Sequence, residues 1–200
     1  MSNTAYLICE IMGTIAFSVS GALVGIKKKM DVFGVTMLGL ITAVGGGVFR
    51  DLIIGVNPPK AFQNPLYAFI AIAVAIITFL PAVRKLINLD QKLWVFIDAI
   101  GLAVFTVIGV KAGQQFNNIF LEIFLGTVTG VGGGVVRDIC AQEMPMIFVR
   151  HFYACASIAG ALICAVIYPV NSGIAVILGI TVIIILRMLA AKYKWHLPKA

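Results

Sequence analysis

Long apolar segments alternate with short polar breaks along the whole chain. The segments cover residues 4–26, 33–54, 62–83, 93–111, 118–140, 150–169 and 172–190. Each is close to the roughly 20 residues that a helix needs to cross a bilayer. Strict alternation of apolar and polar residues is absent, which argues against membrane strands. The pattern therefore predicts an all-α integral membrane protein, a single membrane domain over 1–200 with seven transmembrane helices.

The composition agrees with this prediction. Of the 200 residues, 61% are hydrophobic and 12% are charged, whereas a soluble domain carries about 25% charged residues. The formal net charge of +7 would suggest nucleic-acid binding in a soluble protein. Here the basic residues cluster between apolar segments, where they set topology. We therefore expect membrane lipid as a partner and no nucleic acid.

The distribution of basic residues predicts the orientation of the chain. With the N-terminus outside, two lysines fall at outer ends, Lys60 and Lys111. The cytoplasmic ends then hold Lys27, Lys28, Lys29, Arg84, Lys85, Lys92, Arg150, Arg187, Lys192, Lys194 and Lys199. Because cytoplasmic loops carry an excess of lysine and arginine, the multi-pass chain is predicted to start outside and end in the cytoplasm.

An internal repeat relates two halves of the chain. GLITAVGGGVFRD, which starts at Gly39, matches GTVTGVGGGVVRD, which starts at Gly126. EIMGTIAFSVSG matches DAIGLAVFTVIG, and the match extends to the Tyr67-Ala68 and Tyr153-Ala154 pairs. Repeat 1 spans 4–83 and repeat 2 spans 93–169, each with three segments. Three is odd, so the second copy enters from the opposite side, which makes two inverted three-helix repeats plus a seventh helix at 172–190.

Three consecutive glycines occupy the centre of each copy. They are Gly45, Gly46 and Gly47 in the first copy and Gly132, Gly133 and Gly134 in the second. A stripe of small residues lets helices approach closely, and packing explains part of the pattern. Each interior glycine also costs a helix about 1 kcal/mol relative to alanine. The triple run therefore favours a kink or local break in a helix that lines a pore, because irregular backbone at membrane depth usually lines a cavity.

Six of the charged residues within the predicted spans form two equivalent clusters. They are Glu10, Arg50 and Asp51 in repeat 1, and Asp98, Arg137 and Asp138 in repeat 2. Intramembrane charges usually face the bundle interior and pair there. We expect each acid at the start of a repeat to meet the arginine of its cluster, which leaves Asp51 or Asp138 free to meet permeating cations. The alternative is that all six neutralise one another and only brace the helices.

Lys111 lies at the outer end of the fourth span and has an apolar counterpart near Leu23. An interfacial lysine can simply extend its amine to water. A cation at a pore mouth can also block, gate or sense voltage. Both interpretations stay open.

Enzymatic chemistry is not expected. The sequence shows no Ser/His/Asp set, no metal cluster and no phosphate-binding loop. GGGVFRD lacks the Lys-Ser/Thr of a phosphate-binding loop and falls within a predicted span. We therefore expect no catalytic residue, no metal and no cofactor.

These motifs resemble the bacterial branch of the trimeric intracellular cation (TRIC) channel family. The resemblance rests on the two GGGVxRD motifs in spans 2 and 5 and on DAIGLAVFTVIG in span 4. It implies a homotrimer in the bacterial inner (plasma) membrane, with one pore in each protomer between the inverted repeats. Potassium is the implied permeant ion. The kinks are implied at the two glycine triplets, and Lys111 lies where animal members carry a basic residue associated with gating.

A related branch with the same duplicated domain is assigned to uptake of small amino acids such as glycine. The motifs are common to both branches. A secondary transporter of a small zwitterion is therefore the alternative function, and a structural membrane protein without a pathway is a third.

Overall fold

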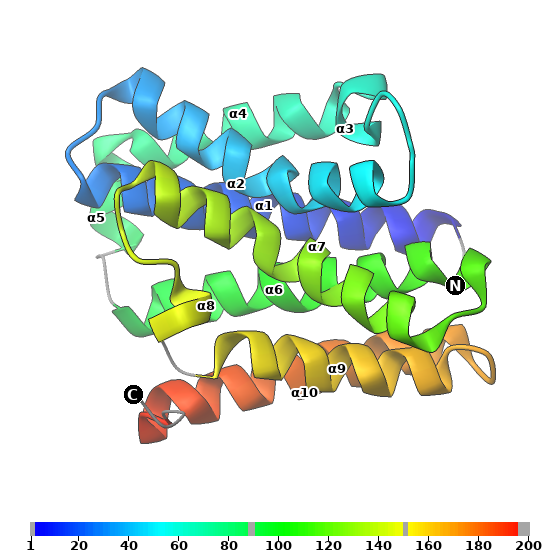
Figure 1. The fold of residues 1–200 in the computed structure, drawn as a ribbon. Helices are drawn as coiled ribbons and strands as arrows, with labels where there is room; N and C mark the ends of the chain where they lie inside the picture. Colours follow the sequence, from blue (N-terminus) through cyan, green and yellow to red (C-terminus); the bar gives the residue numbers. More distant parts are fainter. Residues whose placement is uncertain (1–2, 88–90, 150–151, 196–200) are drawn as a thin grey trace.

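The computed structural model describes residues 3–87, 91–149 and 152–195, and every regular element in these ranges is helical. Figure 1 shows them as a bundle of long, roughly antiparallel helices. The elements are α1 (Asn3–Lys27), α2 (Val32–Ile53), α3 (Lys60–Gln63), α4 (Leu66–Phe79), α5 (Pro81–Ile87), α6 (Gln91–Gly113), the 3-10 turn η1 (Gln114–Phe116), α7 (Ile119–Cys140), α8 (Met146–Val149), α9 (Tyr153–Ile167) and α10 (Ser172–Tyr193).

Five of the described helices are long and apolar enough to cross a membrane. They are α1, α2, α6, α7 and α10. The apolar helices α4 and α9 are shorter, with 14 and 15 residues. The structure is thus that of an all-helical membrane protein, while the count of seven spans stays a prediction.

The predicted third and sixth spans are longer than the helices that form there. The span predicted at 62–83 contains α4, with α3 before it and α5 after it. Pro65 lies directly before α4 and Pro81 opens α5, and proline stops a helix because it lacks the N–H of the helical ladder. The span predicted at 150–169 contains α9 from residue 153 onward, and residues 150–151 lie outside the described ranges.

Equivalent residues begin equivalent helices in the two halves. The side chain of Asp31 accepts a hydrogen bond from the Gly34 N–H and caps α2. Asn118, 87 positions later, accepts from the Leu121 N–H and caps α7. Such caps satisfy backbone donors that lack a partner in the first turn. The duplication therefore extends beyond the glycine motif to the start of each helix.

The two halves pack around a shared centre. Phe17 of α1 and Phe105 of α6 contact each other with ring centroids 5.3 Å apart. Each ring lies against a glycine of the other helix, Gly101 and Gly13. In Figure 1, α1 and α6 run in opposite directions, as do α2 and α7. These opposed directions are those of an inverted repeat.

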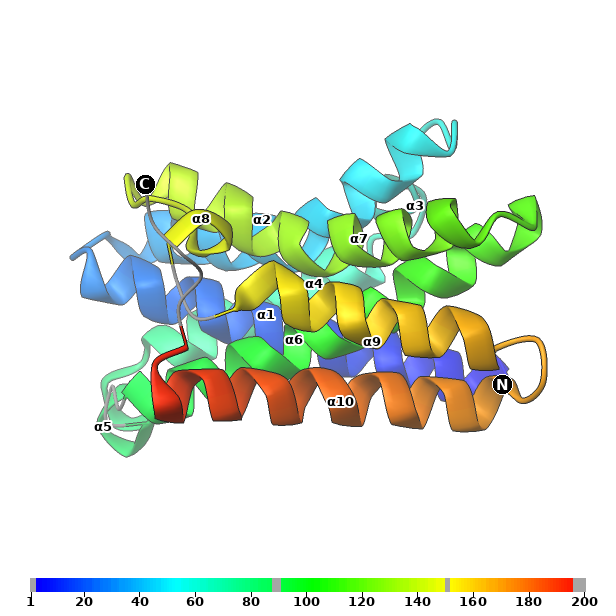
Figure 2. The ribbon, with the colours of Figure 1, turned by 60° about the horizontal axis from the view of Figure 1, so that its bottom comes forward.

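The last helix covers one half. α10 packs on α6 and α9, and Figure 2 shows it along the length of α9. Both partners follow the middle of the chain, so α10 adds a layer beside the second half of the molecule.

Candidate functional site

The two glycine triplets form the crossing of α2 and α7. A methyl group on Gly46 would overlap the carbonyl oxygen of Thr129, and one on Gly133 would overlap the carbonyl oxygen of Thr42. Here the helix backbones touch directly, which only glycine allows. Close packing therefore accounts for the middle glycine of each triplet.

Neither triplet interrupts its helix. α2 is helical from Val32 to Ile53 and α7 from Ile119 to Cys140. The local break named as one alternative is therefore absent, because close packing of the two backbones offsets the weak helix propensity of glycine. A kink at each triplet stays a prediction. The ribbon of α2 does change direction about half-way along its length in Figure 1.

The last glycine of each triplet has different surroundings in the two halves. A methyl group on Gly47 would meet only the end of the Arg50 side chain, 3.8 Å away. One on Gly134 would lie 3.0 Å from the Tyr153 hydroxyl. Gly47 borders a cavity, whereas Gly134 is covered.

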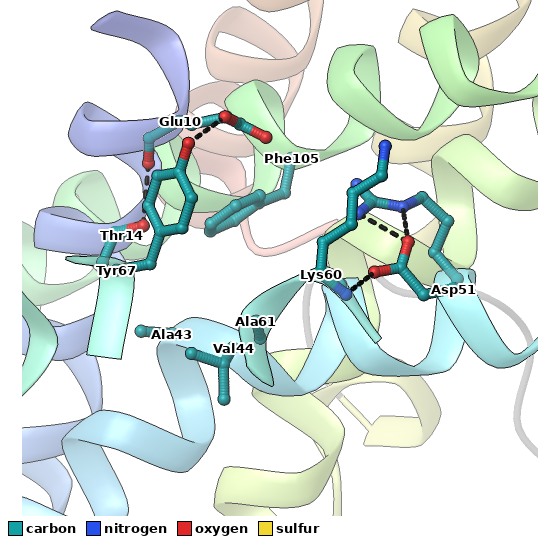
Figure 3. Close-up of a pocket in the computed structure, with 11 residues that line it drawn as sticks. Glu10, Thr14, Ala43, Val44, Asp51, Lys60, Ala61, Tyr67 and Phe105 are labelled. Atoms are coloured by element: carbon teal, nitrogen blue, oxygen red, sulfur yellow. Dashed lines mark hydrogen bonds and ion pairs between the residues drawn. The ribbon is translucent and has the colours of Figure 1, made fainter. Parts of the chain in front are cut away.

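The first half-site consists of Glu10, Arg50, Asp51 and Tyr67. Arg50 donates from Nε to Asp51 Oδ1 at 2.9 Å, and its Nη2 lies 2.8 Å from the same oxygen. The second oxygen of Asp51 accepts the N–H of Lys60, at the start of α3, at 2.8 Å. Glu10 accepts a hydrogen bond from the hydroxyl of Tyr67 (Figure 3).

A cavity of about 50 Å³ lies within the first half-site. One water needs about 10–15 Å³ of such space, so the cavity has room for several waters. Figure 3 shows Glu10 and Tyr67 toward one end and Asp51 with Lys60 toward the other. Its lining comprises Glu10, Thr14, Ala43, Val44, Gly47, Arg50, Asp51, Lys60, Ala61, Tyr67 and Phe105.

The second half-site consists of Asp98, Arg137, Asp138 and Tyr153. Arg137 donates from Nε to Asp138 Oδ1 at 2.9 Å, and Asp138 Oδ2 accepts the N–H of Met146, at the start of α8, at 2.9 Å. These two contacts repeat those of Arg50 and Asp51 in the first half-site. In addition, Arg137 Nη1 lies 2.5 Å from Asp98 Oδ1. All four side chains are buried.

Two further helices reach into the second half-site. Ser20 of α1 donates to Asp98 Oδ1 at 3.0 Å and accepts from Arg137 Nη1 at 2.7 Å. Arg187 of α10 is 1% exposed; its Nη2 lies 4.0 Å from Asp98 Oδ2, and its guanidinium carbon lies 4.5 Å from the centre of the Tyr153 ring. Side chains of α1, α6, α7, α9 and α10 thus meet at one buried cluster.

The structure confirms one predicted ion pair and contradicts the other. Asp98 meets Arg137 as expected. Glu10 meets Tyr67, and no ion pair joins it to Arg50 in the described ranges. Neither Asp51 nor Asp138 is free, because both oxygens of each carboxylate are held by an arginine and a backbone N–H.

Lys111 joins the first half-site. Its amine lies 3.4 Å from the centre of the Tyr6 ring of α1, a favourable position for a cation. It is close enough to Glu10 and Lys60 to interact with both electrostatically. Among the described residues, no group of three or more histidine, cysteine or acidic side chains could hold a metal ion.

Sequence reasoning missed Arg187 and the role of the two tyrosines. Arg187 looked like one more basic residue at a cytoplasmic helix end, but α10 turns it inward toward Asp98. The matched pairs at Tyr67 and Tyr153 in the repeat were the available signal for the tyrosines.

A family model described as "Glycine transporter" matches residues 7–82 and 95–169. These two segments fall within the two predicted repeats. The chain belongs to this glycine transporter family. α10 lies outside both matched segments.

Named relatives of this family member are membrane proteins. The chain is 38% identical over 192 residues to the UPF0126 inner membrane protein YadS of Escherichia coli K12, a match that covers 94% of this chain and 91% of the relative.

The glycine transporter family member also shares its fold with TRIC channels, as the sequence resemblance implied. A structure that addresses conductance through TRIC cation channels is 35% identical, has a TM-score of 0.86 and covers 96% of each chain. The TRIC trimeric intracellular cation channel orthologue from Rhodobacter sphaeroides is 29% identical, with a TM-score of 0.87 over 96% of this chain and 100% of that one.

Proposed function

We propose that the protein is a potassium-permeable channel for monovalent cations, with a pathway in each protomer between the two repeats. The similarity to TRIC cation channels, 35% identity over 96% of the chain, carries this proposal. The cavity of the first half-site supports it, since Glu10 and Asp51 are among its lining residues.

The proposed pathway starts at the cavity and continues along the crossing of α2 and α7 to the second half-site. Gly45, Gly46, Gly47, Gly132, Gly133 and Gly134 are its proposed lining and bending positions. In this structure the backbones of α2 and α7 touch at Gly46 and Gly133. Passage of an ion therefore requires the two helices to shift against each other. We infer a closed state of the proposed pathway, because the backbones touch at the crossing.

The charged residues have two roles in this proposal. Arg50 with Asp51 and Arg137 with Asp138 brace the helices, because each carboxylate is fully engaged. Glu10 borders the cavity and is the carboxylate that a cation meets there. Lys111, beside Tyr6 and near Glu10, is the candidate gating cation, because its charge opposes a cation in the cavity.

We further propose seven spans in the bacterial inner membrane, with the N-terminus outside and the C-terminus cytoplasmic. The inner-membrane assignment of the Escherichia coli relative supports the location. A homotrimer is proposed because the Rhodobacter sphaeroides orthologue is described as trimeric.

Reconstitution into planar bilayers tests the channel. With a potassium gradient and a large impermeant anion, we expect single-channel currents that reverse near the potassium equilibrium potential. The Glu10→Gln variant should carry less current, because the cavity loses the Glu10 carboxylate. Absence of current from folded, correctly reconstituted protein would contradict the proposal.

A carrier for glycine is the second candidate, and two observations favour it. The matching family model is described as a glycine transporter. The cavity has a carboxylate, Glu10, toward one end and a cationic side chain, Lys60, toward the other (Figure 3). Arg50, paired with Asp51, also lines the cavity. Such an arrangement suits the ammonium and carboxylate groups of a zwitterion. Saturable, electrically silent uptake of radiolabelled glycine into liposomes would establish the carrier, and current without such uptake would exclude it.

A further inference from the structure

The acids at equivalent positions of the two halves have different partners. Glu10 accepts from Tyr67, whereas Asp98 pairs with Arg137. Tyr153 is the repeat counterpart of Tyr67, yet its buried hydroxyl has no hydrogen-bond partner among the described residues. An unsatisfied buried hydroxyl costs about 1–3 kcal/mol. The tyrosine is thus satisfied in one half and unsatisfied in the other.

The arginines show the opposite difference. Arg137 has two acidic partners, Asp98 and Asp138. In the described ranges, Arg50 pairs with Asp51 alone. Glu10 and Arg50 border the same cavity, and glutamate is one methylene longer than aspartate. The cavity therefore separates Glu10 from Arg50 within the first half-site.

We propose that Tyr67 is a positioning residue that holds Glu10 away from Arg50 and so keeps the first half-site open. When Glu10 leaves Tyr67 for Arg50, the first half-site takes the arrangement of the second, and the cavity closes. The second half-site opens when Asp98 moves from Arg137 to the free hydroxyl of Tyr153. This inference rests on the proposed function, because it gives the cavity a role in permeation.

Tyr6 is a second tyrosine beside Glu10 and interacts with it in part through its hydroxyl, while the amine of Lys111 lies over its ring. Its repeat counterpart is Trp94, which has no hydroxyl and lies beside Arg137, 5.2 Å from ring centre to guanidinium carbon. Among the described tyrosines of the two half-sites, Tyr67 and Tyr153 are the pair at equivalent positions of the repeat.

Thiol labelling of the cavity tests the proposal. Val44 borders the cavity, and Val131, its counterpart 87 positions later, is buried. Val44→Cys and Val131→Cys serve as reporters in full-length protein in which Cys9, Cys140 and Cys155 are replaced by serine and the buried Cys164 is retained. Lipid nanodiscs expose both membrane faces to a small methanethiosulfonate reagent.

Tyr67→Phe should slow labelling of Val44→Cys by about tenfold, because a hydrogen bond to a charged group contributes about 1.5–3 kcal/mol. Tyr153→Phe is the matched control and should leave both labelling rates unchanged, since its hydroxyl has no hydrogen bond to lose. Adding Glu10→Gln to Tyr67→Phe should restore labelling, because glutamine forms no ion pair with Arg50.

A purely structural role for Tyr67 would lower the unfolding temperature without this rescue. The proposal is overturned if Tyr67→Phe leaves the labelling of Val44→Cys unchanged, or if the double variant stays protected. If Tyr67→Phe does not fold, Glu10→Gln alone decides, because it must keep the cavity labelled. Labelling needs no ion flux, so a missing potassium current would contradict the proposed function and leave this result standing.

Discussion

The two half-sites share one set of hydrogen bonds and differ in the side chains that surround it. In each, an arginine holds the next aspartate, and that aspartate accepts the N–H at the start of a short helix. The first half-site borders a cavity. In the second, the equivalent acid has moved onto the arginine, and Ser20 and Arg187 complete a buried cluster. Helix α10, which has no counterpart in the first half, supplies the added cation.

This difference shows that a duplicated sequence need not give two equal sites. The elements that duplicate are local: the caps, the glycine crossing and the Arg-Asp pairs. The elements that differ come from outside the repeat motif, from α10 and from Ser20. A symmetric scaffold with unequal surroundings can hold one end of a pathway open while the other is shut, as two-state membrane proteins require.

The crossing of α2 and α7 should be the same from both halves, and substitutions there should have the largest effect on stability. Gly46→Ala and Gly133→Ala each drive a methyl group into a backbone carbonyl of the other helix. We expect each to lower the free energy of unfolding by about 3 kcal/mol or more, measured by thermal unfolding in detergent. Gly45→Ala is the control, because its methyl group would meet Gly133 Cα at an ordinary 3.6 Å. A large difference between the Gly46 and Gly133 variants would break the symmetry.

Arg187→Gln tests what makes the halves unequal. It removes the second cation near Asp98 and the contact with the Tyr153 ring, which should lower the free energy of unfolding by about 2 kcal/mol. It should also speed labelling of Val131→Cys without changing that of Val44→Cys. Lys192→Gln, at the exposed end of the same helix, should do neither. Equal acceleration at both reporters would mean that α10 does not act on one half alone.

Alanine at the last glycine of each triplet should give the smallest effects on stability, and these should differ between the two halves. Gly47→Ala gains helix propensity, about 1 kcal/mol, and meets only the flexible end of Arg50. Gly134→Ala places its methyl group 3.0 Å from the Tyr153 hydroxyl, so the gain should be cancelled or reversed. Thermal unfolding of the two variants side by side measures the difference, and equal stabilisation would show that Tyr153 does not cover Gly134.

Much of the helical framework could be predicted from the sequence. The apolar segments placed the long helices within a few residues, since bilayer length and hydropathy are local signals. Pro65 and Pro81, which bound α4, both fall inside the span predicted at 62–83, so the prediction made this helix too long. The pairing of Asp98 with Arg137 followed from the repeat.

The remaining contacts depend on tertiary packing. Nothing in the linear pattern distinguishes a basic residue that snorkels to water from Arg187, which α10 turns inward. Equally, the repeat predicted the same pairing for Glu10 and Asp98, because it carries no information on which partner each acid chooses. The difference arises from neighbouring helices that lie far away in sequence.

The most direct test of the unequal half-sites compares the reporters Val44→Cys and Val131→Cys in protein in which Cys9, Cys140 and Cys155 are serine and both half-sites are otherwise unaltered. In nanodiscs, the account predicts that Val44→Cys reacts at least about tenfold faster, a ratio that corresponds to about 1.4 kcal/mol in the cost of opening. Equal rates at the two positions, in protein shown to be folded, would contradict the claim that the first half-site is open and the second closed.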